Sequence, residues 1–334
     1  ILINKHKRTE EKNHRLNYLL PQYSFCNNSM SRNEMIDLAD KFAVMRRQEE
    51  TTYKVPDYLS PRYIASNLSP SAELQTPRKS IVDDDLRVEI VHWSYKVVDY
   101  LNMDRETVSI SLSLFDRFLS IHTVNKKVAQ LVGLTSLYLA VKLSEQEWKM
   151  KMPLLLSHFI TLSRDNFTAR DIVGMEALIL STLRYHVHPP TPQSVVSHLL
   201  LMFPQHVNPE STRRITDYAT FLTELSVCEY FFVTRKTSSI ALAALIVGMD
   251  NDPYLSPVDR KTFLESVRQV TTIDSNSLEV EECRMNLQML YNGSEKFDDD
   301  ISEQYTAANN PESTFRTETV SPVSVTGIID DPMC

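Results

Sequence analysis

The chain has 334 residues, of which 42% are hydrophobic, so it can bury the core of one large domain or of two domains of ordinary size. Only five residues are glycine, which argues against the glycine-rich loops that hold phosphates and dinucleotides. The formal net charge is −8, whereas a protein that mainly holds nucleic acid carries a surplus of basic residues. We therefore expect no cofactor and no nucleic-acid partner.

The cysteines and the apolar runs bear on the cellular compartment. The four cysteines are widely spaced and form neither a zinc-type pair nor a disulfide framework, which is typical of a reducing compartment. No apolar run approaches the ~20 residues that cross a bilayer, and the first residues lack the apolar core of a signal peptide. We therefore expect no membrane partner, and the cytoplasm and the nucleus both stay open.

The first 82 residues are predicted to form an arm, one helix and a strap. Residues 1–33 are polar and mixed, and we expect them to be disordered. In the segment 34–82, apolar residues first recur every three or four positions up to residue 49, which predicts an amphipathic helix with Ser31 as its N-cap. Four prolines follow among Ser, Thr and Asn residues, so the rest of this segment is predicted to be an extended strap.

Residues 83–188 predict a bundle of five helices. Three consecutive aspartates precede the first helix, where acidic side chains suit the positive end of the helix dipole. The second begins near Arg105, and the third follows Asn125 and is apolar on nearly every side between residues 131 and 143, as a central helix should be. A proline begins the short fourth helix, and Thr168 caps a fifth that is ended by the prolines after residue 188.

The helical pattern then starts again in residues 189–291. Five further helical segments are predicted, at 192–203, 209–228, 236–249, 257–270 and 274–291. Proline lies at or near the start of three of them, where its missing N–H group costs nothing. The sequence therefore predicts an all-α fold of two consecutive five-helix bundles. Residues 292–334 are acidic, rich in Pro, Glu, Ser and Thr, and lack apolar periodicity, so we expect a disordered tail.

Several short motifs follow one another through both predicted bundles. They are Leu86-Arg87 with Trp93, Phe115-Asp116-Arg117-Phe118-Leu119-Ser120, Leu131-Val132-Gly133-Leu134, Leu139-Ala140-Val141-Lys142-Leu143-Ser144-Glu145, Met175-Glu176 with Ile179-Leu180 and Leu183, Pro190-Thr191-Pro192, Phe221-Leu222 with Glu224-Leu225-Ser226, and Ser239-Ile240-Ala241-Leu242-Ala243-Ala244. In order and spacing they resemble the cyclin family, and the last two resemble mitotic (A/B)-type cyclins. The resemblance covers residues 34–291.

The resemblance implies an N-terminal cyclin box at residues 83–188 and a C-terminal cyclin fold at residues 189–291. It further implies a regulatory subunit that binds and activates a cyclin-dependent serine/threonine kinase in cell-cycle control and catalyses no reaction itself. Such a subunit is expected in the nucleus and the cytoplasm, with the kinase, and in addition its substrates or inhibitors, as partners.

Lys142 and Glu176 are the main candidates for binding the kinase. A lysine in an otherwise apolar helix, or a glutamate on the fifth helix, is by itself most often a solvated surface residue. The two residues match the cyclin motif, however. The resemblance therefore implies that they pair at the surface and hydrogen-bond backbone groups of the kinase near its mobile regulatory helix.

Further contacts are implied by the same resemblance. Ile179, Leu183 and Phe159 are candidate apolar anchors for the kinase, with an ordinary core position as the alternative for each. The predicted helix before residue 50 matches one that touches the kinase in mitotic-type cyclins, with a helix that only covers the core as the alternative. Arg87 is implied to pair with Asp116 and so to stabilise the box.

Trp93 and Gln130 match a docking groove that accepts basic-hydrophobic motifs in some cyclins, although a tryptophan in the core is at least as common. The sequence departs from that groove, because Glu89 and Lys96 stand where an apolar and an acidic residue are usual. A lysine at this place repels a basic motif. Docking in the usual mode is therefore not expected.

Candidate modification sites and rival functions remain. Thr76, followed by Pro-Arg-Lys, fits the preferred site of the kinases that cyclins activate, and Ser321 before a proline fits it more loosely. His186 and His188 lack a further ligand at suitable spacing, so no metal site is expected. The alternatives in function are a cyclin-fold transcription protein, which calls for a basic face, and a cyclin-fold scaffold with no kinase-activating role.

Overall fold

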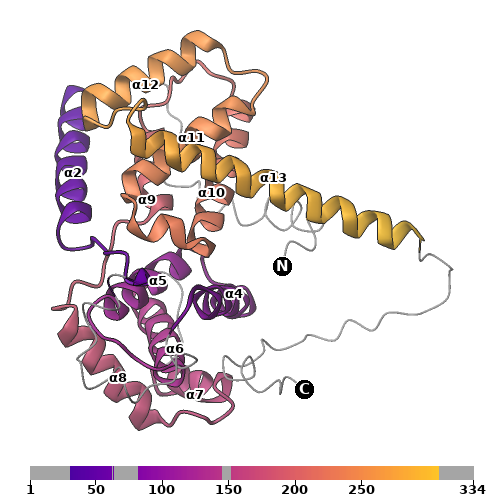
Figure 1. Ribbon diagram of the computed structural model, residues 1–334. Helices are drawn as coiled ribbons and strands as arrows, with labels where there is room; N and C mark the ends of the chain where they lie inside the picture. The colour runs from indigo at the N-terminus through magenta and orange to yellow at the C-terminus, as the bar shows by residue number, and fades with distance from the viewer. Residues whose placement is uncertain (1–30, 62, 64–81, 145–151, 308–334) are drawn as a thin grey trace.

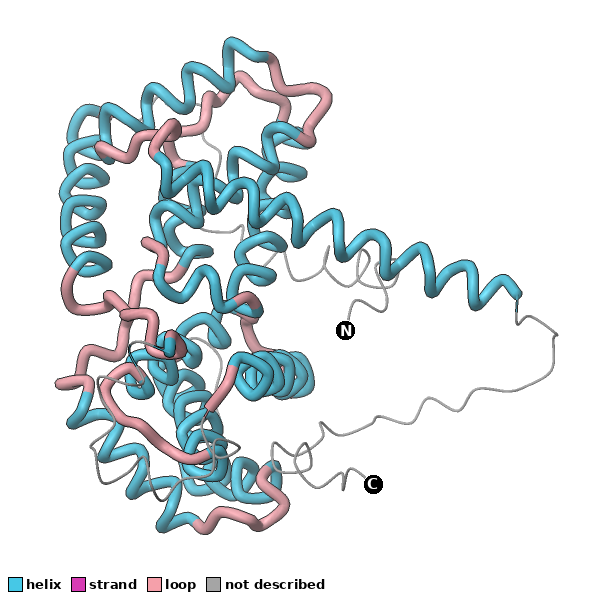
Figure 2. The backbone as a smooth tube through the Cα atoms, viewed as in Figure 1, coloured by secondary structure: helices cyan, strands magenta, loops and turns pink. Residues whose placement is uncertain are grey.

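The computed structural model describes residues 31–61, 63, 82–144 and 152–307. Within these ranges the chain forms eleven α-helices, one short 3-10 helix and no β-strand (Figures 1 and 2). The all-α fold expected from the sequence is therefore confirmed. No helix in this described part of the chain is long and apolar enough to span a membrane.

Five helices form an N-terminal bundle, in the lower half of Figure 1. They are α4 (Asp84–Tyr100), α5 (Glu106–Leu119), α6 (Lys126–Leu143), α7 (Met152–Leu162) and α8 (Ala169–Thr182). Nearly every residue of α6 from 129 to 141 is buried, and α6 contacts each of the other four helices. The helix that is apolar on nearly every side in the sequence is thus the centre of the bundle.

Side chains that precede three of these helices cap their first turns. Asp83 accepts a hydrogen bond from a backbone N–H group of α4, and Asn125 accepts one from a backbone N–H group of α6. Thr168 forms a reciprocal capping box with Asp171 at the start of α8. These caps satisfy N–H groups that have no partner inside the helix, so they fix where each helix begins.

A glycine allows α4 and α6 to cross closely. A Cβ atom added to Gly133 would lie 2.9 Å from Cγ2 and 3.3 Å from Cδ1 of Ile90, a side chain that is fully buried in α4. No real Cβ fits at the shorter distance, so the two helices would have to move apart. The packing of this bundle therefore depends on a residue without a side chain at position 133.

Five further helices and one 3-10 helix form a C-terminal bundle. They are α9 (Pro192–Leu200), α10 (Pro209–Cys228), η3 (Tyr230–Thr234), α11 (Thr237–Asp250), α12 (Pro257–Thr271) and α13 (Leu278–Ala307). Every residue of α11 from 238 to 249 is buried, so α11 has the central place that α6 has in the first bundle. Proline occupies the first turn of α9, α10 and α12, as the sequence analysis expects.

The predicted boundary between helix and tail at residue 292 differs from the structure. α13 continues to Ala307 and projects well beyond the bundle (Figure 1). The sequence loses its apolar periodicity near residue 292 because the helix leaves the core there. Loss of contact with a core does not by itself end the backbone hydrogen bonding of a helix.

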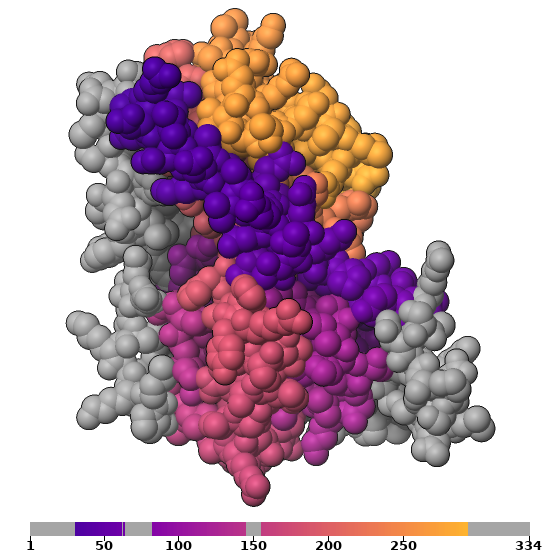
Figure 3. All heavy atoms as spheres, turned by 90° about the vertical axis from the view of Figure 1, so that its left-hand side faces the viewer, coloured from indigo at the N-terminus to yellow at the C-terminus, as the bar shows by residue number. Residues whose placement is uncertain are grey.

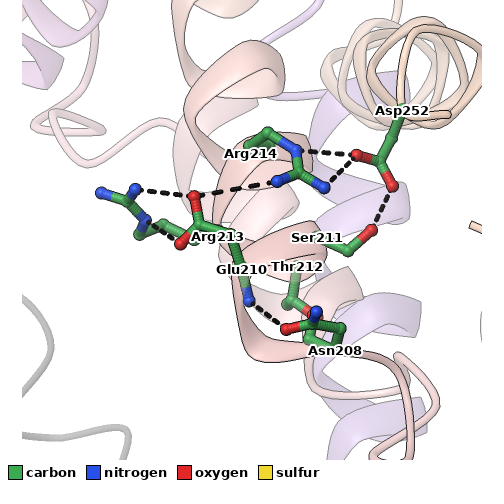
Figure 4. A network of polar contacts seen from close by, with 7 residues as sticks. All are labelled: Asn208, Glu210, Ser211, Thr212, Arg213, Arg214 and Asp252. Atoms are coloured by element: carbon green, nitrogen blue, oxygen red, sulfur yellow. Dashed lines mark hydrogen bonds and ion pairs between the residues drawn. The ribbon is translucent and has the colours of Figure 1, made fainter. Parts of the chain in front are cut away.

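A polar network ties the start of α10 to the turn after α11 (Figure 4). Nε of Arg214 donates to Oδ1 of Asp252 at 2.9 Å, and Ser211 donates to the other oxygen of the same carboxylate. The Asp252 side chain is almost completely buried. The network therefore joins two segments of one bundle around a buried charge that is fully paired.

The helix α2 (Arg32–Glu50) precedes the N-terminal bundle in the chain but packs on the C-terminal bundle, next to α12 (Figures 1 and 3). Ser31 forms a capping box with Glu34 at its start, so the predicted N-cap is confirmed. Leu38 and Phe42 are buried in one core with residues of α9 to α13. In packing terms, α2 is a member of the C-terminal bundle.

A strap (residues 51–61) follows α2 and lies against both bundles. Tyr58 donates a hydrogen bond of 2.7 Å to Asp116 in α5, and its ring meets that of Tyr230 in η3 edge-on at 5.4 Å. The hydroxyl of Tyr230 accepts from the N–H group of Leu59 at 3.0 Å and donates to Asp57 at 3.0 Å. The strap is thus fixed to the first bundle and to the second.

Candidate functional site

Lys142 and Glu176 lie side by side where α6 and α8 meet at the surface. Lys142 is in the last turn of α6 and Glu176 is in the middle of α8, and the Lys142 Nζ donates a hydrogen bond to the Glu176 Oε1. Their side chains are 24% and 14% exposed. The structure therefore brings together, at the edge of the bundle, the two residues that the resemblance paired.

An aromatic ring packs against the ammonium group of Lys142. The Lys142 Nζ lies 5.1 Å from the ring centroid of Tyr138, one turn earlier in α6, within the range of a cation–π interaction. The Tyr138 ring in turn packs edge-on against Phe159 of α7 at 5.4 Å. Burial raises the pKa of the Tyr138 phenol, so this ring stays neutral. The ammonium group is thus held between a carboxylate and an aromatic face.

The pair keeps hydrogen-bonding capacity for a partner. An ammonium group has three donors and a carboxylate has about four acceptor positions, while the bond between the two residues uses one of each. Both side chains reach solvent. Lys142 can therefore donate to a backbone carbonyl, and Glu176 can accept from a backbone N–H group, while their mutual bond is kept.

The outer face of α8 carries exposed apolar residues. Val173, one turn before Glu176, is 49% exposed, and Leu178, farther round the helix, is 45% exposed. Between them, Gly174 has no neighbour within 4 Å of where a Cβ would lie, so this part of the helix is open to a partner. Charged groups with spare hydrogen-bonding capacity next to exposed apolar side chains are typical of a protein interface.

The predicted apolar anchors lie elsewhere. Ile179, Leu183 and Phe159 are all buried in the core of the N-terminal bundle, so none of them presents a surface to a kinase. Ile179 follows the buried Met175 by four residues, which puts both on the inner face of α8. The structure contradicts an interface role for these three residues and assigns each the alternative, a place in the core.

Arg87 and Asp116 form a buried ion pair between α4 and α5. Nε and Nη2 of Arg87 donate to the two oxygens of Asp116 at 2.9 Å and 3.0 Å. Nη1 donates to the carbonyl of Val227 in α10 at 3.0 Å. Burial opposes the charge of Arg87, but the Asp116 carboxylate outweighs it and the pKa of Arg87 is raised. The pair that the resemblance implied thus also reaches the C-terminal bundle.

Comparison with known proteins agrees with this architecture. Residues 40–188 match the family described as the N-terminal domain of cyclins. This segment of the chain is similar to the N-terminal domain of cyclins. The match includes α4 to α8, the Arg87–Asp116 pair and both members of the Lys142–Glu176 pair.

The proteins that this chain resembles include mitotic cyclins, as the sequence motifs indicated. Cyclin-B2-2 of Arabidopsis thaliana is 30% identical over 164 residues, which are 49% of this chain and 36% of that protein. G2/mitotic-specific cyclin-2 of Medicago sativa is 30% identical over 164 residues, which are 49% of this chain and 47% of that protein. The chain thus matches less than half the length of each of these relatives.

A solved structure supports the fold over both bundles. A viral cyclin from herpesvirus saimiri superposes with a TM-score of 0.54 at 15% sequence identity, covering 77% of this chain and 95% of that chain. The likeness therefore extends well beyond the residues of the N-terminal domain match. The second bundle of this chain, as well as the first, has the fold expected from the sequence.

The residues of the predicted docking groove are buried in this structure. Trp93 and Gln130 are each only 2% exposed, so neither side chain offers a surface to a docking motif. Among the buried polar atoms in the described ranges, the Trp93 Nε1 has no hydrogen-bond partner. Lys96 is exposed and remains the residue that repels a basic motif, while Glu89 is half-buried where an apolar residue is usual. The structure thus contradicts a groove formed by Trp93 and Gln130 as they lie here.

Other candidate residues are not part of a site in the structure. Thr76 and Ser321 lie outside the described residues. Within the described ranges, no group of three or more His, Cys, Asp or Glu side chains could hold a metal ion. His186 and His188 are both exposed, and the ring of His186 contacts the carbonyl of Leu183.

Two polar residues that matter in the structure were missed in the sequence. Glu49 of α2 is buried and accepts hydrogen bonds from the N–H group of Ser238, at 2.9 Å, and from its hydroxyl, at 2.5 Å. Arg105 forms an ion pair with Glu224 of α10. Glu49 lies in register with the apolar positions 38, 42 and 45, which is a signal that could have found it. No local pattern connects Arg105 to Glu224.

Proposed function

We propose that this chain is a cyclin that binds a cyclin-dependent protein kinase and activates it. The contact surface is the kinase-facing patch, which we define as Lys142, Val173, Gly174, Glu176 and Leu178. The observation that carries the proposal is the Lys142–Glu176 pair, which lies at the surface, retains unused donors and acceptors and has the exposed Val173 one turn away on α8. The match to the cyclin N-terminal domain supports the same reading.

Activation follows from a shift in the population of kinase conformations. A protein kinase is active when its catalytic lysine is paired with a glutamate on its regulatory helix. A patch that binds backbone groups and apolar side chains near that helix favours the active arrangement only if it binds that arrangement more tightly than the inactive one. The cyclin supplies no catalytic group in this mechanism and acts as a regulatory subunit.

The helix α2 is proposed as a second contact. Its Ile36 and Val44 are about half exposed, and Figure 3 shows α2 (indigo) on the same side of the molecule as the segment that contains α8 (pink). One partner can therefore touch both elements. The resemblance to mitotic-type cyclins, in which an N-terminal helix touches the kinase, supports this assignment. Action in the nucleus and the cytoplasm, and further contacts with substrates or inhibitors, belong to the same proposal.

The test is recovery of kinase activity from a lysate of the source cells. We expect the native chain to recover an active kinase, and the double variant Lys142→Ala, Glu176→Ala to lose at least about tenfold of that activity, because hot-spot residues each contribute a large share of binding. Kinase activity is measured as phosphate transfer to a generic basic substrate. The control is Lys126→Ala, which breaks the Lys126–Asp83 pair at the other end of α6.

The control variant should behave like the native chain. Equal recovery of partners by the native chain and the double variant, without kinase activity in either, would sink the proposal. The scaffold and transcription alternatives would then be favoured. Binding of nucleic acid that weakens steeply with added salt would favour the transcription protein over the scaffold.

A further inference from the structure

The two proposed kinase contacts belong to different bundles. α8 is part of the N-terminal bundle, whereas α2 is fixed to the C-terminal one through its buried apolar residues, the Glu49–Ser238 hydrogen bonds and an ion pair of 2.9 Å between Glu50 and Lys236. The placement of α2 relative to α8 therefore depends on the contacts between the bundles and on the strap, whose Tyr58 is held by Asp116 of the first bundle. Any residue that sets those contacts also sets the geometry of the whole binding face.

Arg105 forms an ion pair across the contact between the two bundles, which we call the seam. It directly precedes α5 in the N-terminal bundle, and its Nε lies 2.7 Å from Oε2 of Glu224 in α10. Its Nη1 donates to both oxygens of Asp99, at 2.9 Å and 2.8 Å, on its own side of the seam. The guanidinium lies 4.4 Å from the ring centroid of Tyr95, and the Tyr95 hydroxyl donates to the Glu224 carbonyl at 3.1 Å. One planar group is therefore held rigidly by its own bundle and points at the other.

A second arginine reaches the same turn of α10. Arg87 donates to the carbonyl of Val227, three residues after Glu224. Arg87 is fully buried and also holds Asp116, so its removal would disturb the core of the first bundle. The Arg105 side chain is 21% exposed and belongs to neither core, although it covers one face of the buried Tyr95 ring. We therefore expect a change at Arg105 to disturb the bundles less than a change at Arg87.

We infer that Arg105 is a positioning residue that sets α10, and with it the C-terminal bundle and α2, relative to the kinase-facing patch on α8. The inference rests on the proposed function. Arg105 touches no kinase in this scheme. It acts through the ion pair with Glu224, which keeps the α2 contact and the α8 contact at the spacing that one kinase molecule requires.

The experiment is a double-mutant cycle on kinase affinity between the seam and α2. Arg105→Ala is measured in the native chain and in a chain whose α2 contact is removed by Ile36→Asp and Val44→Asp. We expect Arg105→Ala to weaken binding roughly tenfold in the native chain. In the chain without the α2 contact it should change affinity less than about twofold, because a displaced α2 no longer matters there. Glu224→Gln, which keeps the size of the side chain, should reproduce the effect.

Arg214→Ala is the matched control. Arg214 also pairs with a carboxylate, that of Asp252 (Figure 4). It lies 5.0 Å from the ring centroid of Tyr254, and all three residues are within the C-terminal bundle. We expect it to leave kinase affinity unchanged in both backgrounds. If Arg105→Ala lowers affinity by the same factor with and without the α2 contact, or not at all, the positioning role is overturned while the proposed function stands. If the native chain binds no kinase, both are overturned.

Discussion

Two ion pairs in the N-terminal bundle have opposite surroundings. Arg87 and Asp116 are buried and every charged atom has a partner, among them the hydroxyl of Tyr58. Lys142 and Glu176 reach solvent and have donors and acceptors to spare. A fully satisfied buried pair suits a fixed structural joint, whereas a half-satisfied surface pair suits a reversible contact. The two ion pairs thus suit different roles because one is buried and the other reaches solvent.

Loss of the buried pair should be costly. We expect Asp116→Ala to lower the free energy of unfolding by about 3–5 kcal/mol, because it leaves the Arg87 cation buried without an anion. Lys126→Ala, which breaks the exposed Lys126–Asp83 pair, should lower it by less than about 1 kcal/mol. Urea unfolding followed by circular dichroism measures both variants. Similar small losses for the two would show that the Arg87–Asp116 pair does not hold α4 to α5.

Among the elements, the crossing of α4 and α6 allows a sharp comparison of two glycines. Gly133→Ala forces a Cβ to within 2.9 Å of Ile90, so we expect a loss of about 1–3 kcal/mol in stability. Gly174→Ala on α8 meets nothing within 4 Å, so we expect a gain of roughly 0.5–1 kcal/mol from the better helix former. Thermal unfolding measures whether each variant is less stable or more stable than the native chain. A stable Gly133→Ala protein would contradict the close approach of the helices.

The attachment of α2 to α11 should depend on pH. Burial raises the pKa of the Glu49 carboxyl, against the opposing hydrogen bonds from Ser238 and the charges of Arg46 and Lys236. An acid whose pKa is raised in the folded state adds stability that is complete below its unfolded pKa and is lost as pH rises through the folded pKa. We therefore expect α2 to be held most firmly in mildly acidic solution.

Hydrogen exchange of the α2 amides, corrected for the intrinsic rate at each pH, measures this effect. Protection in the native chain should fall as pH rises through the raised pKa of Glu49. In Glu49→Gln, which has no charge to desolvate, protection should not change over the same range. If protection of the α2 amides in the native chain were also independent of pH, the prediction would be refuted.

For the whole molecule, the sequence predicted the helices better than their partners. Apolar periodicity, caps such as Ser31 and Thr168, and prolines in first turns identify the elements because these signals act within a few residues. The Lys142–Glu176 and Arg87–Asp116 pairs came from the resemblance to cyclins. Contacts between distant segments, such as Arg105 with Glu224, leave no local signal and needed the structure.

The sequence alone does not show which side of α8 packs against the core. Periodicity indicates that Ile179 and Leu178 lie on different sides of the helix but does not say which side meets the core. The structure decides this, because the inner side packs against α6 and the outer side is bare. The apolar contacts proposed for the kinase therefore moved from Ile179 and Leu183 to Val173 and Leu178, while the charged pair stayed.

The packing of α2 on the second bundle has a consequence for synthesis. α2 leaves the ribosome first, but Ser238, which Glu49 binds, follows 189 residues later. At a usual elongation rate this interval is on the order of ten to forty seconds. During that time Leu38 and Phe42 have no core to enter, so the nascent helix is a target for chaperones. The proposed two-part binding face is therefore complete only after α11 has been made, and a shorter nascent chain cannot hold both proposed kinase contacts in place.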